Sequence, residues 1–487
     1  MEATSVPRAT TRTGLALFVI MVGILMVAID TTIVVLALPE IETSLHVALS
    51  AVIWVIIGYL LTITLLSTQV GKLGDMFGRV RMYEFGFLIF IVGSALCALA
   101  TNEATIIGFR IVQGIGGSLI MANSGAVLAD TFPPERLGRA YGFSSVGYNI
   151  GAILGILLGG IVITYISWRW IFWINVPIGI IAFVLALKVL KDSGKRNRQR
   201  LDIPGMVTLG AGLFGILWGM TKLATDPFSV EIFLFFAFGV VFLIIFGIIE
   251  RMREEPMVNL SIFKIPTMTP TLLASFFQGL ANFAVLFLVI MYLQGVRQFT
   301  PLHASLLLVP GYLLGSFISP MAGRLSDRLG PVLPASVGLG IQVVALIIYA
   351  QFGVSTPVLV VVLASAVNGI GASAFFPANN SSIMKVTPDA MFGIASGMLR
   401  TFSNVGMIFS FAVAILVAAR SIPRQLAFAI FVGTTKLSTQ VSAVFTSGLH
   451  AAFYASTVFM AVAALLSATR VLKRSPKKLN VDSGSNG

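Results

Sequence analysis

The chain has 487 residues, of which 57% are hydrophobic and only 10% are charged, and its formal net charge is +13. A soluble domain carries about 25% charged residues, so this composition excludes a soluble globular protein and predicts an integral membrane protein. The apolar runs show no sustained alternation and are longer than the roughly 10-residue strands of membrane β-barrels. They therefore predict an all-α polytopic membrane protein.

Fourteen transmembrane helices can be placed along the chain, each near the roughly 20 apolar residues that a span requires. They are expected near residues 14–38, 50–70, 82–100, 104–129, 137–165, 168–190, 204–222, 231–249, 268–292, 303–323, 332–350, 357–378, 391–419 and 449–469. The single cysteine, Cys97, lies in an apolar run and excludes a disulfide within the chain.

The basic residues support this count, because the cytoplasmic loops of membrane proteins are enriched in Lys and Arg. With the N-terminus in the cytoplasm, only six of the 32 Lys and Arg residues fall in outer segments, and two more fall within spans. A missed helix would invert every later loop and remove the bias. We therefore expect a cell-membrane protein with both termini in the cytoplasm, and no nucleic-acid partner. The basic runs are then topology signals, with a lipid-headgroup site as the alternative.

The first predicted span contains one carboxylate, Asp30, within an otherwise uncharged run from Gly14 to Pro39. An ionised Asp at the centre of a helix costs roughly 2.5 to 3.5 kcal/mol on insertion scales. Asp30 must therefore stay protonated, pair with another group, or face a water-filled cavity. We expect it to face a cavity in the outer half of the N-terminal bundle.

The chain repeats itself, which predicts two related halves. The segment from Gly71 to Gly78 matches the segment from Gly323 to Gly330, and a second match begins at Gln113 and at Asn368 and continues without a gap. Parallel repeats of six helices are typical of transporters whose substrate site lies between the halves. We expect an N-terminal bundle at 1–190, a basic loop with two inserted helices at 191–267, and a C-terminal bundle with a tail at 268–487.

The repeated loop after the second span is a candidate conformational latch. Gly71 and Gly78 allow two helix ends to approach closely, and Asp75 can sit against the positive N-terminal end of another helix. Arg79 can pair with Asp130 at the end of the fourth span, and Asp327 is the repeat counterpart of Asp75. The alternative is an ordinary charged loop, which the repetition disfavours.

A buried cation in the fourth span is the candidate partner of Asp30. Arg110 lies at a depth similar to that of Asp30, and a buried guanidinium stays charged and requires a partner. The two side chains can therefore interact directly or through water. A static ion pair and an arginine that reaches the outer surface are the alternatives.

Glycines in the fifth span are spaced for close packing. Gly147, Gly151, Gly155 and Gly159 recur every four residues and form one face of the helix, a groove for a neighbouring helix.

Polar residues in the other apolar runs are candidates for a substrate cavity. A single buried Asn or Gln more often joins helices by hydrogen bonding, which is the alternative for each. The candidates are Tyr59, Asn149, Phe276, Gln278, Asn282, Asn368, Arg400 and Asn404. The sequence shows no constellation of an enzyme or a metal site and no phosphate-binding P-loop, so neither catalysis nor ATP-driven transport is expected.

These motifs resemble the major facilitator superfamily, specifically its fourteen-helix drug–proton antiporter branch. The Gly71–Arg81 loop resembles the signature loop after the second helix, and Arg110–Gly117 resembles the motif of the fourth helix. Asp30–Pro39 and Trp168–Gly179 resemble stretches of the fourteen-helix branch. The resemblance implies the major facilitator fold, two six-helix bundles plus two inserted helices.

The resemblance also implies residue roles and an activity. It assigns Asp30 and Arg110 to proton coupling, and Asp75, Arg79 and Asp130 to the conformational latch. The activity that it implies is proton-coupled efflux of drugs or toxic compounds by alternating access. Two residues depart from the pattern, since Ile156 replaces the proline of the antiporter motif and Met76 replaces an arginine of the loop.

We therefore expect a monomeric multidrug exporter in the lipid bilayer that takes small amphipathic substrates, cationic or neutral. It would need no cofactor, with the proton gradient as its energy source. One alternative is a transporter of a single metabolite, lipid or siderophore on the same scaffold. Another is a membrane sensor that does not transport, which the intact repeat of the loop disfavours.

Overall fold

The computed structural model describes residues 9–46, 52–192, 196, 200–253, 256, 267–387, 392–418 and 439–472, and this part of the chain contains helices but no strand. The helices of the first half are α1 (Ala9–Leu45), α3 (Trp54–Phe77), α4 (Arg79–Ala98), α5 (Glu103–Thr131), η1 (Pro134–Arg136), α6 (Leu137–Tyr165), α7 (Trp170–Trp173) and α8 (Asn175–Val189). The remaining ones are α9 (Ile203–Thr225), α10 (Val230–Met252), α11 (Met268–Met291), η3 (Tyr292–Val296), α12 (Pro301–Leu329), α13 (Val332–Tyr349), α14 (Val358–Val386), α15 (Phe392–Ala418) and α17 (Thr439–Leu472).

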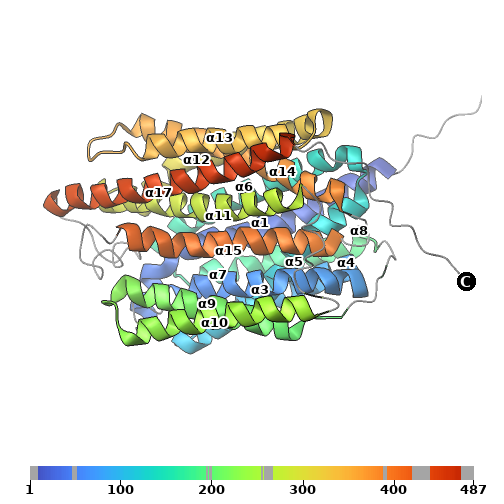
Figure 1. Ribbon diagram of the computed structural model, residues 1–487, viewed down its shortest axis with the longest axis horizontal. Coiled ribbons are helices and arrows are strands. Elements are labelled where there is room, and N and C mark those ends of the chain that lie inside the picture. The colour runs from blue at the N-terminus through green and yellow to red at the C-terminus, as the bar shows by residue number, and fades with distance from the viewer. Residues whose placement is uncertain are drawn as a thin grey trace, which may run out of the picture.

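The helices confirm the predicted all-α membrane fold. Twelve of the described helical segments are long and apolar enough to cross a membrane, and α3, whose two segments are bent by 51°, makes thirteen. The helix α15 runs alongside them through the bundle (Figure 1). The count of fourteen spans stays a prediction.

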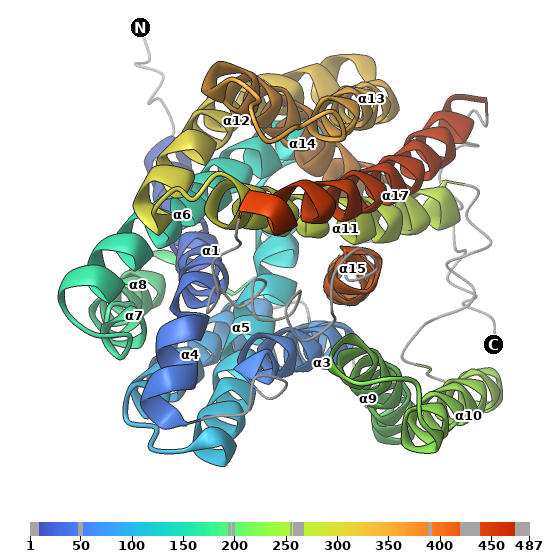
Figure 2. The same ribbon diagram turned by 90° about the vertical axis from the view of Figure 1, so that its left-hand side faces the viewer.

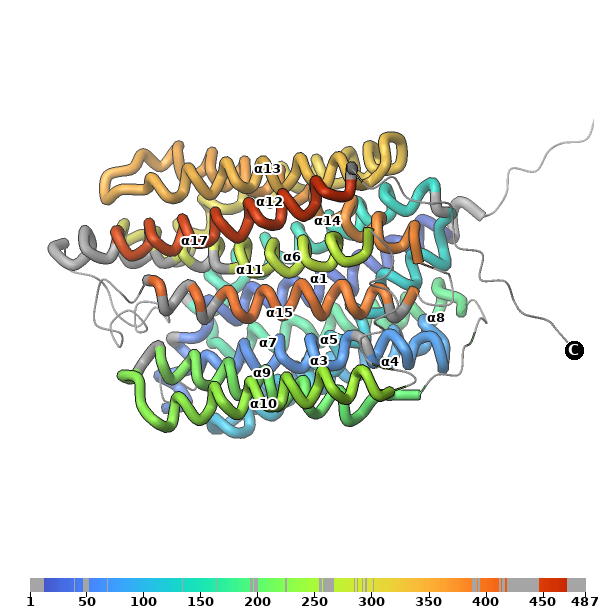
Figure 3. Tube along the Cα trace, in the orientation of Figure 1, coloured from blue at the N-terminus to red at the C-terminus, as the bar shows by residue number. Residues whose placement is uncertain are grey.

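One end of the bundle carries both termini of the described helices. The helix α1 begins at the right-hand end of the molecule in Figure 1 and α17 runs toward that end, and the tube in Figure 3 follows the same path. We call this end the terminal end. The α3–α4 junction and the α12–α13 junction lie there as well.

The packing joins two sets of helices and a peripheral pair. In the first set, α1 packs on α6 and α5 packs on α3 and α4, and in the second set α11 packs on α15 and α14 packs on α12 and α13. The two sets meet where α6 packs on α12 and where α3 packs on α15. Figure 2 shows α9 and α10 standing outside both sets, with α9 against α3 and α15. The division at residues 190 and 267 stays a prediction.

The predicted repeat is visible in the backbone. Gly78 ends α3 with φ of 111° and Gly330 ends α12 with φ of 87°, and no other glycine of the described chain has a positive φ. Residues with a side chain rarely adopt such angles. The two matching segments therefore make equivalent helix-to-helix turns.

The glycines of α6 form the predicted groove, and α1 occupies it. A Cβ atom at Gly151 would lie 2.5 Å from the Leu25 carbonyl oxygen, and one at Gly155 would lie 2.7 Å from the Ile29 carbonyl oxygen. The repeat counterpart of Gly151 is Gly406 in α15, where a Cβ would lie 2.1 Å from the Phe276 carbonyl oxygen of α11. These close backbone contacts bring α1 and α11 to the centre of the molecule.

Candidate functional site

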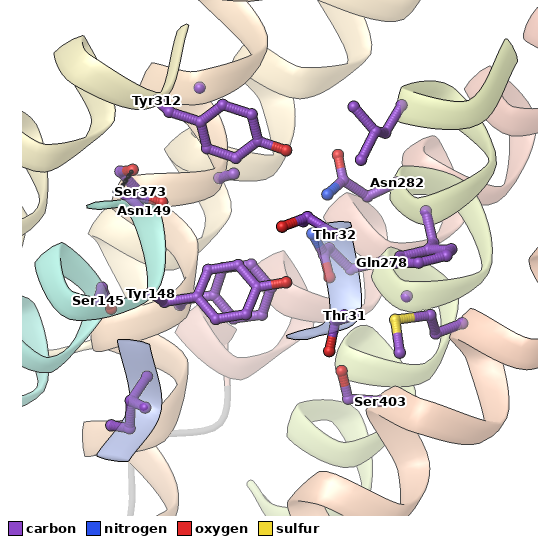
Figure 4. Close-up of a pocket in the computed structure, with 18 of the residues that line it drawn as sticks. Thr31, Thr32, Ser145, Tyr148, Asn149, Gln278, Asn282, Tyr312, Ser373 and Ser403 are labelled. Atoms are coloured by element: carbon purple, nitrogen blue, oxygen red, sulfur yellow. Dashed lines mark hydrogen bonds between the residues drawn. The ribbon is translucent and has the colours of Figure 1, made fainter. Parts of the chain in front are cut away.

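A central cavity lies between the two sets of helices. Its volume is about 210 Å³, and its wall is formed by α1, α3, α5 and α6 from the first half and by α11 to α15 from the second. Figure 4 shows the side chains of α1 and α11 on one side of this space and those of α6 on the other. The position between the halves is the one that the repeat predicts for a substrate site.

Most of the residues proposed for the cavity from the sequence lie in its wall. They are Asn149, Gln278, Asn282, Asn368, Arg400 and Asn404. Tyr59 and Phe276 are placed elsewhere. The Tyr59 ring packs under the Arg110 guanidinium, 4.1 Å from ring centroid to Cζ, and the Phe276 ring packs on Phe277 with centroids 5.2 Å apart.

Hydroxyl groups of the wall were not singled out from the sequence. Tyr148 and Tyr312 both direct their hydroxyl groups into the space in Figure 4. Thr31, Thr32, Ser373 and Ser403 line it as well. Ser and Thr fit in transmembrane helices because their hydroxyl can donate to a backbone carbonyl of the same helix, as Thr31 does to the Val27 carbonyl at 2.8 Å. Their abundance hides the few that face a cavity.

Amide side chains connect the wall to the helix behind it. Gln342 of α13 donates from Nε2 to Oδ1 of Asn282 at 3.0 Å and to Oδ1 of Asn368 at 3.3 Å. On the other side, Asn149 donates to the Ser373 hydroxyl at 3.2 Å and so joins α6 to α14. These bonds fix the orientation of three amide groups that line the cavity.

Asp30 lies at the centre of a second, fully buried cluster. Arg110 donates from Nη1 to Asp30 Oδ2 at 2.7 Å, and Gln113 donates from Nε2 to Oδ1 at 2.8 Å. Asn175 of α8 donates to the same Oδ1 at 3.3 Å. The guanidinium also donates to the Val55 carbonyl at 2.9 Å, so the cluster joins α1, α3, α5 and α8.

Asp30 does not face the cavity, contrary to the expectation from the sequence. Its side chain has no exposed surface and is not part of the cavity wall, although the next two residues of α1, Thr31 and Thr32, are. The sequence left open whether Asp30 and Arg110 interact directly or through water, and the structure shows a direct ion pair. An α-helix turns about 100° per residue, so consecutive side chains on α1 face the cluster and then the cavity.

Two partners of Asp30 were not assigned from the sequence. Gln113 stands one turn after Arg110 and therefore on the same face of α5. Asn175 is the polar residue of the apolar stretch from Trp170 to Gly179. Both are polar residues within apolar spans, and a comparison with the depth of Asp30 in its span would identify them as candidate partners.

The predicted latch residues meet at the terminal end. Arg79 pairs through Nε with Asp75 Oδ1 at 2.8 Å and through Nη1 with Asp130 Oδ1 at 2.6 Å. The same guanidinium lies 5.7 Å from the ring centroid of Phe392, the first residue of α15. The group therefore connects α3, α4 and α5 and borders the second half.

The glycines of the loop motif have different surroundings. Gly71 lies buried in the last part of α3. A Cβ at Gly78 would lie 1.8 Å from a carboxylate oxygen of Asp192, so a side chain there would clash in addition to straining the backbone.

Asp327 makes the helix-end contact that the motif suggests. Its two carboxylate oxygens accept hydrogen bonds from the backbone N–H groups of Gly138 and Arg139, each at 2.9 Å. These are among the first N–H groups of α6, which have no acceptor within the helix. Lys385 lies 3.5 Å from Asp327 Oδ1. One carboxylate of the second half thus holds the start of a helix of the first half.

A family model decides the classification. The model described as Major Facilitator Superfamily matches residues 20–411. The chain belongs to this superfamily. Its relatives include the riboflavin transporter RibZ of Clostridioides difficile, which is 30% identical over 80% of this chain and 85% of that protein. The tetracenomycin C resistance and export protein of Streptomyces glaucescens is 30% identical over 83% of this chain and 76% of that protein.

Further likenesses agree with the superfamily. The multidrug resistance protein 3 of Bacillus subtilis is 32% identical over 66% of this chain and 63% of that protein. Among solved structures, the proton:xylose symporter XylE aligns with a TM-score of 0.65 at 14% identity, covering 95% of this chain and 96% of that one, which shows the shared major facilitator fold. The family and the relatives indicate a membrane transporter rather than an enzyme.

Proposed function

We propose that the protein is a proton-coupled exporter of small amphipathic compounds, of the fourteen-helix drug–proton antiporter branch, that works by alternating access. The exporters among its relatives support the direction of transport. The observation that carries the proposal is the buried Asp30–Arg110 cluster, one residue along α1 from the cavity wall. In this proposal the terminal end faces the cytoplasm, and the proton gradient across the cell membrane supplies the energy.

Protonation of Asp30 would change the cluster in a defined way. The ionised carboxylate accepts hydrogen bonds from Arg110, Gln113 and Asn175. A proton on one oxygen neutralises the charge that balances the guanidinium and turns one acceptor into a donor. The new O–H group needs an acceptor and the ion pair with Arg110 is lost, so the contacts that join α1 to α5 and α8 differ between the two protonation states.

The helix α1 would carry this difference to the substrate. Thr31 and Thr32 line the cavity directly beside Asp30, and Thr32 together with Leu25 and Ile29 also contacts the glycine groove of α6. Because α6 also packs on α12 of the second half, a movement of α1 against α6 would reach the contact between the halves. Substrate and proton would therefore compete through one helix.

The latch groups would select the end that opens. Asp327 holds α6 to α12, and Thr401 of α15 donates to the Thr64 carbonyl of α3 at 3.1 Å. Both contacts cross between the halves. We propose that they keep the cavity closed toward the terminal end in this state and that they break when the cavity opens to the cytoplasm.

A second candidate function is transport of one specific metabolite. The observation that favours it is the fixed arrangement of amide groups around Gln342, which suits a substrate with matching hydrogen-bonding groups. An exporter of many compounds would also accept substrates whose groups do not match these amides.

Proton flux in reconstituted vesicles tests the proposal. Purified protein in liposomes with an internal pH-sensitive dye is exposed to a panel of amphipathic compounds and of metabolites. The proposal predicts substrate-dependent proton movement with several chemically different compounds. Proton movement with a single metabolite would favour the second function, and substrate movement without any proton movement would contradict proton coupling.

A further inference from the structure

The charge of the cavity wall is positive. Among the described residues that line the cavity, Arg400 is the one charged side chain, and no Asp or Glu is present. Asp30, the one deeply placed carboxylate of the sequence, lies outside the wall and is already paired with Arg110. A cationic substrate in this cavity would therefore meet a like charge and no counter-ion.

Arg400 is presented to the cavity by a regular face of α15. Arg400, Ser403, Asn404 and Met407 all line the space, and their spacing places them along one side of the helix. A guanidinium stays charged at any physiological pH. Within the described part of the chain, no carboxylate pairs with Arg400.

A second donor in the wall also has no protein partner. Gln278 of α11 is 1% exposed, and its Nε2 group has no hydrogen-bond partner among the described residues. A buried N–H group that lacks an acceptor costs free energy. Figure 4 shows Gln278 at the cavity, next to Thr31 and Thr32. An acceptor group on a ligand would satisfy it.

The rest of the wall suits an aromatic body. Phe283 and Phe376 line the cavity together with Tyr148, Tyr312 and Tyr349. Aromatic rings stack on such side chains and gain about 0.5–1.5 kcal/mol per pair beyond the area that they bury. The cavity thus combines ring surfaces with hydrogen-bond donors and a fixed cation.

We propose that the cavity binds aromatic amphipathic substrates through an acidic group, a carboxylate or an ionised phenol, which pairs with Arg400. Gln278 donates to a further acceptor on the substrate. This inference rests on the proposed transport function, whose substrate class it names, and it replaces the expectation of cationic or neutral substrates drawn from the sequence. A carboxylate and a guanidinium match geometrically and form two parallel charge-assisted bonds.

Two xanthene dyes of opposite charge test the proposal. Fluorescein is anionic at pH 8, and rhodamine 123 is a cation with the same ring system. Their binding to the purified protein in a non-ionic detergent is measured by fluorescence anisotropy. We expect fluorescein to bind at least about tenfold more tightly than rhodamine 123, which corresponds to about 1.4 kcal/mol.

Variants of Arg400 identify the group responsible. Arg400→Gln should weaken fluorescein binding by about tenfold and should not weaken rhodamine 123 binding, because it removes a charge that repels the cation. Arg400→Lys should retain part of the preference because it keeps the charge. Arg251→Gln, which removes an exposed charge at the end of α10, is the matched control. Thermal unfolding and size-exclusion profiles establish that each variant is folded.

The shift in unfolding temperature extends the test beyond one dye. We expect 2-naphthoate to stabilise the wild type more than 2-naphthamide does, and we expect the difference to vanish in Arg400→Gln. Equal or tighter binding of rhodamine 123, the absence of binding by both acids, or a preference that survives Arg400→Gln would each overturn the proposal. Binding in detergent needs no proton gradient, so failure of proton coupling and failure of this inference are separate results.

Discussion

Asp30 illustrates how far one residue can be understood from its surroundings. The cost of an ionised carboxylate in a span left three options, protonation, a partner or a water-filled cavity, and depth suggested Arg110 as the partner. The structure adds Gln113 and Asn175, which complete the set of donors around the two carboxylate oxygens. Which side of α1 faces the cavity could not be predicted, because that depends on how α1 rotates in the glycine groove of α6.

Single glycines provide a direct test of that packing. Gly151→Ala would place a Cβ 2.5 Å from the Leu25 carbonyl oxygen, a backbone atom that cannot rotate away. We expect the variant to lower the unfolding temperature in detergent by several degrees, since overpacking typically costs about 1–3 kcal/mol.

The matched control is another helical glycine. Gly108→Ala places its Cβ in open space within α5, and alanine is favoured over glycine in helices by roughly 0.5–1 kcal/mol. The control should therefore be neutral or slightly stabilising. Equal unfolding temperatures for the two variants would show that α1 and α6 do not pack as closely as described.

At the scale of helices, the repeat makes the contacts between the halves comparable. The repeat counterparts of α6 and α12 are α15 and α3, and both pairs pack across the halves. Asp327 at the end of α12 holds the start of α6, and its counterpart Asp75 at the end of α3 lies in the group that borders the start of α15. The two carboxylates thus occupy equivalent places.

Removing one of these carboxylates should make the cavity accessible from the terminal end. In a Cys97→Ser background, Ser403→Cys places a single thiol in the cavity wall. We expect Asp327→Ala to increase its labelling by an impermeant maleimide several-fold when the reagent is added on the side of the terminal end, because α6 loses the acceptor for two of its first N–H groups.

Glu231→Ala, an exposed carboxylate at the start of α10, is the control for the labelling measurement. It should leave the rate at the wild-type value. An unchanged rate in Asp327→Ala would mean that this contact does not keep the cavity closed.

At the scale of the whole molecule, α9 and α10 form a hairpin outside the two sets of helices. The hairpin docks through Phe214 and Trp218 of α9, whose ring centroids lie 5.3 and 5.2 Å from that of Trp54 in α3. Only 11% of the most apolar 18-residue stretch of α10 is buried in the protein. None of the described cavity residues comes from either helix.

Deletion of the hairpin should therefore spare the binding site. Removal of residues 203–252 takes out two antiparallel helices and leaves the direction of α11 unchanged. We expect a monodisperse protein that still prefers fluorescein to rhodamine 123. Removal of residues 203–225 alone would reverse every later helix and should abolish folding. Loss of dye binding after the hairpin deletion would show that α9 and α10 contribute to the cavity.

The sequence predicts the architecture better than it predicts the cavity. Long apolar runs and the Gly71–Gly78 repeat depend on local physics and on duplication, so the helical bundle follows from them. Which side chains line the cavity depends on how each helix is rotated about its axis. Hydroxyl residues such as Tyr148 and Tyr312 cannot be recognised as lining residues until that rotation is known. The sign of the cavity charge shows this most clearly. Both Arg400 and Asp30 can be recognised in the sequence as charged residues within spans, but only Arg400 lines the cavity wall.

We propose that Asp30 couples proton movement to substrate movement. Substrate-dependent proton flux is measured in vesicles containing wild type, Asp30→Asn or the control Glu231→Gln, together with substrate exchange at equal pH. We expect Asp30→Asn to abolish proton flux while exchange continues, and we expect the control to match the wild type. Substrate-dependent proton flux that persists unchanged in Asp30→Asn would contradict the proposal.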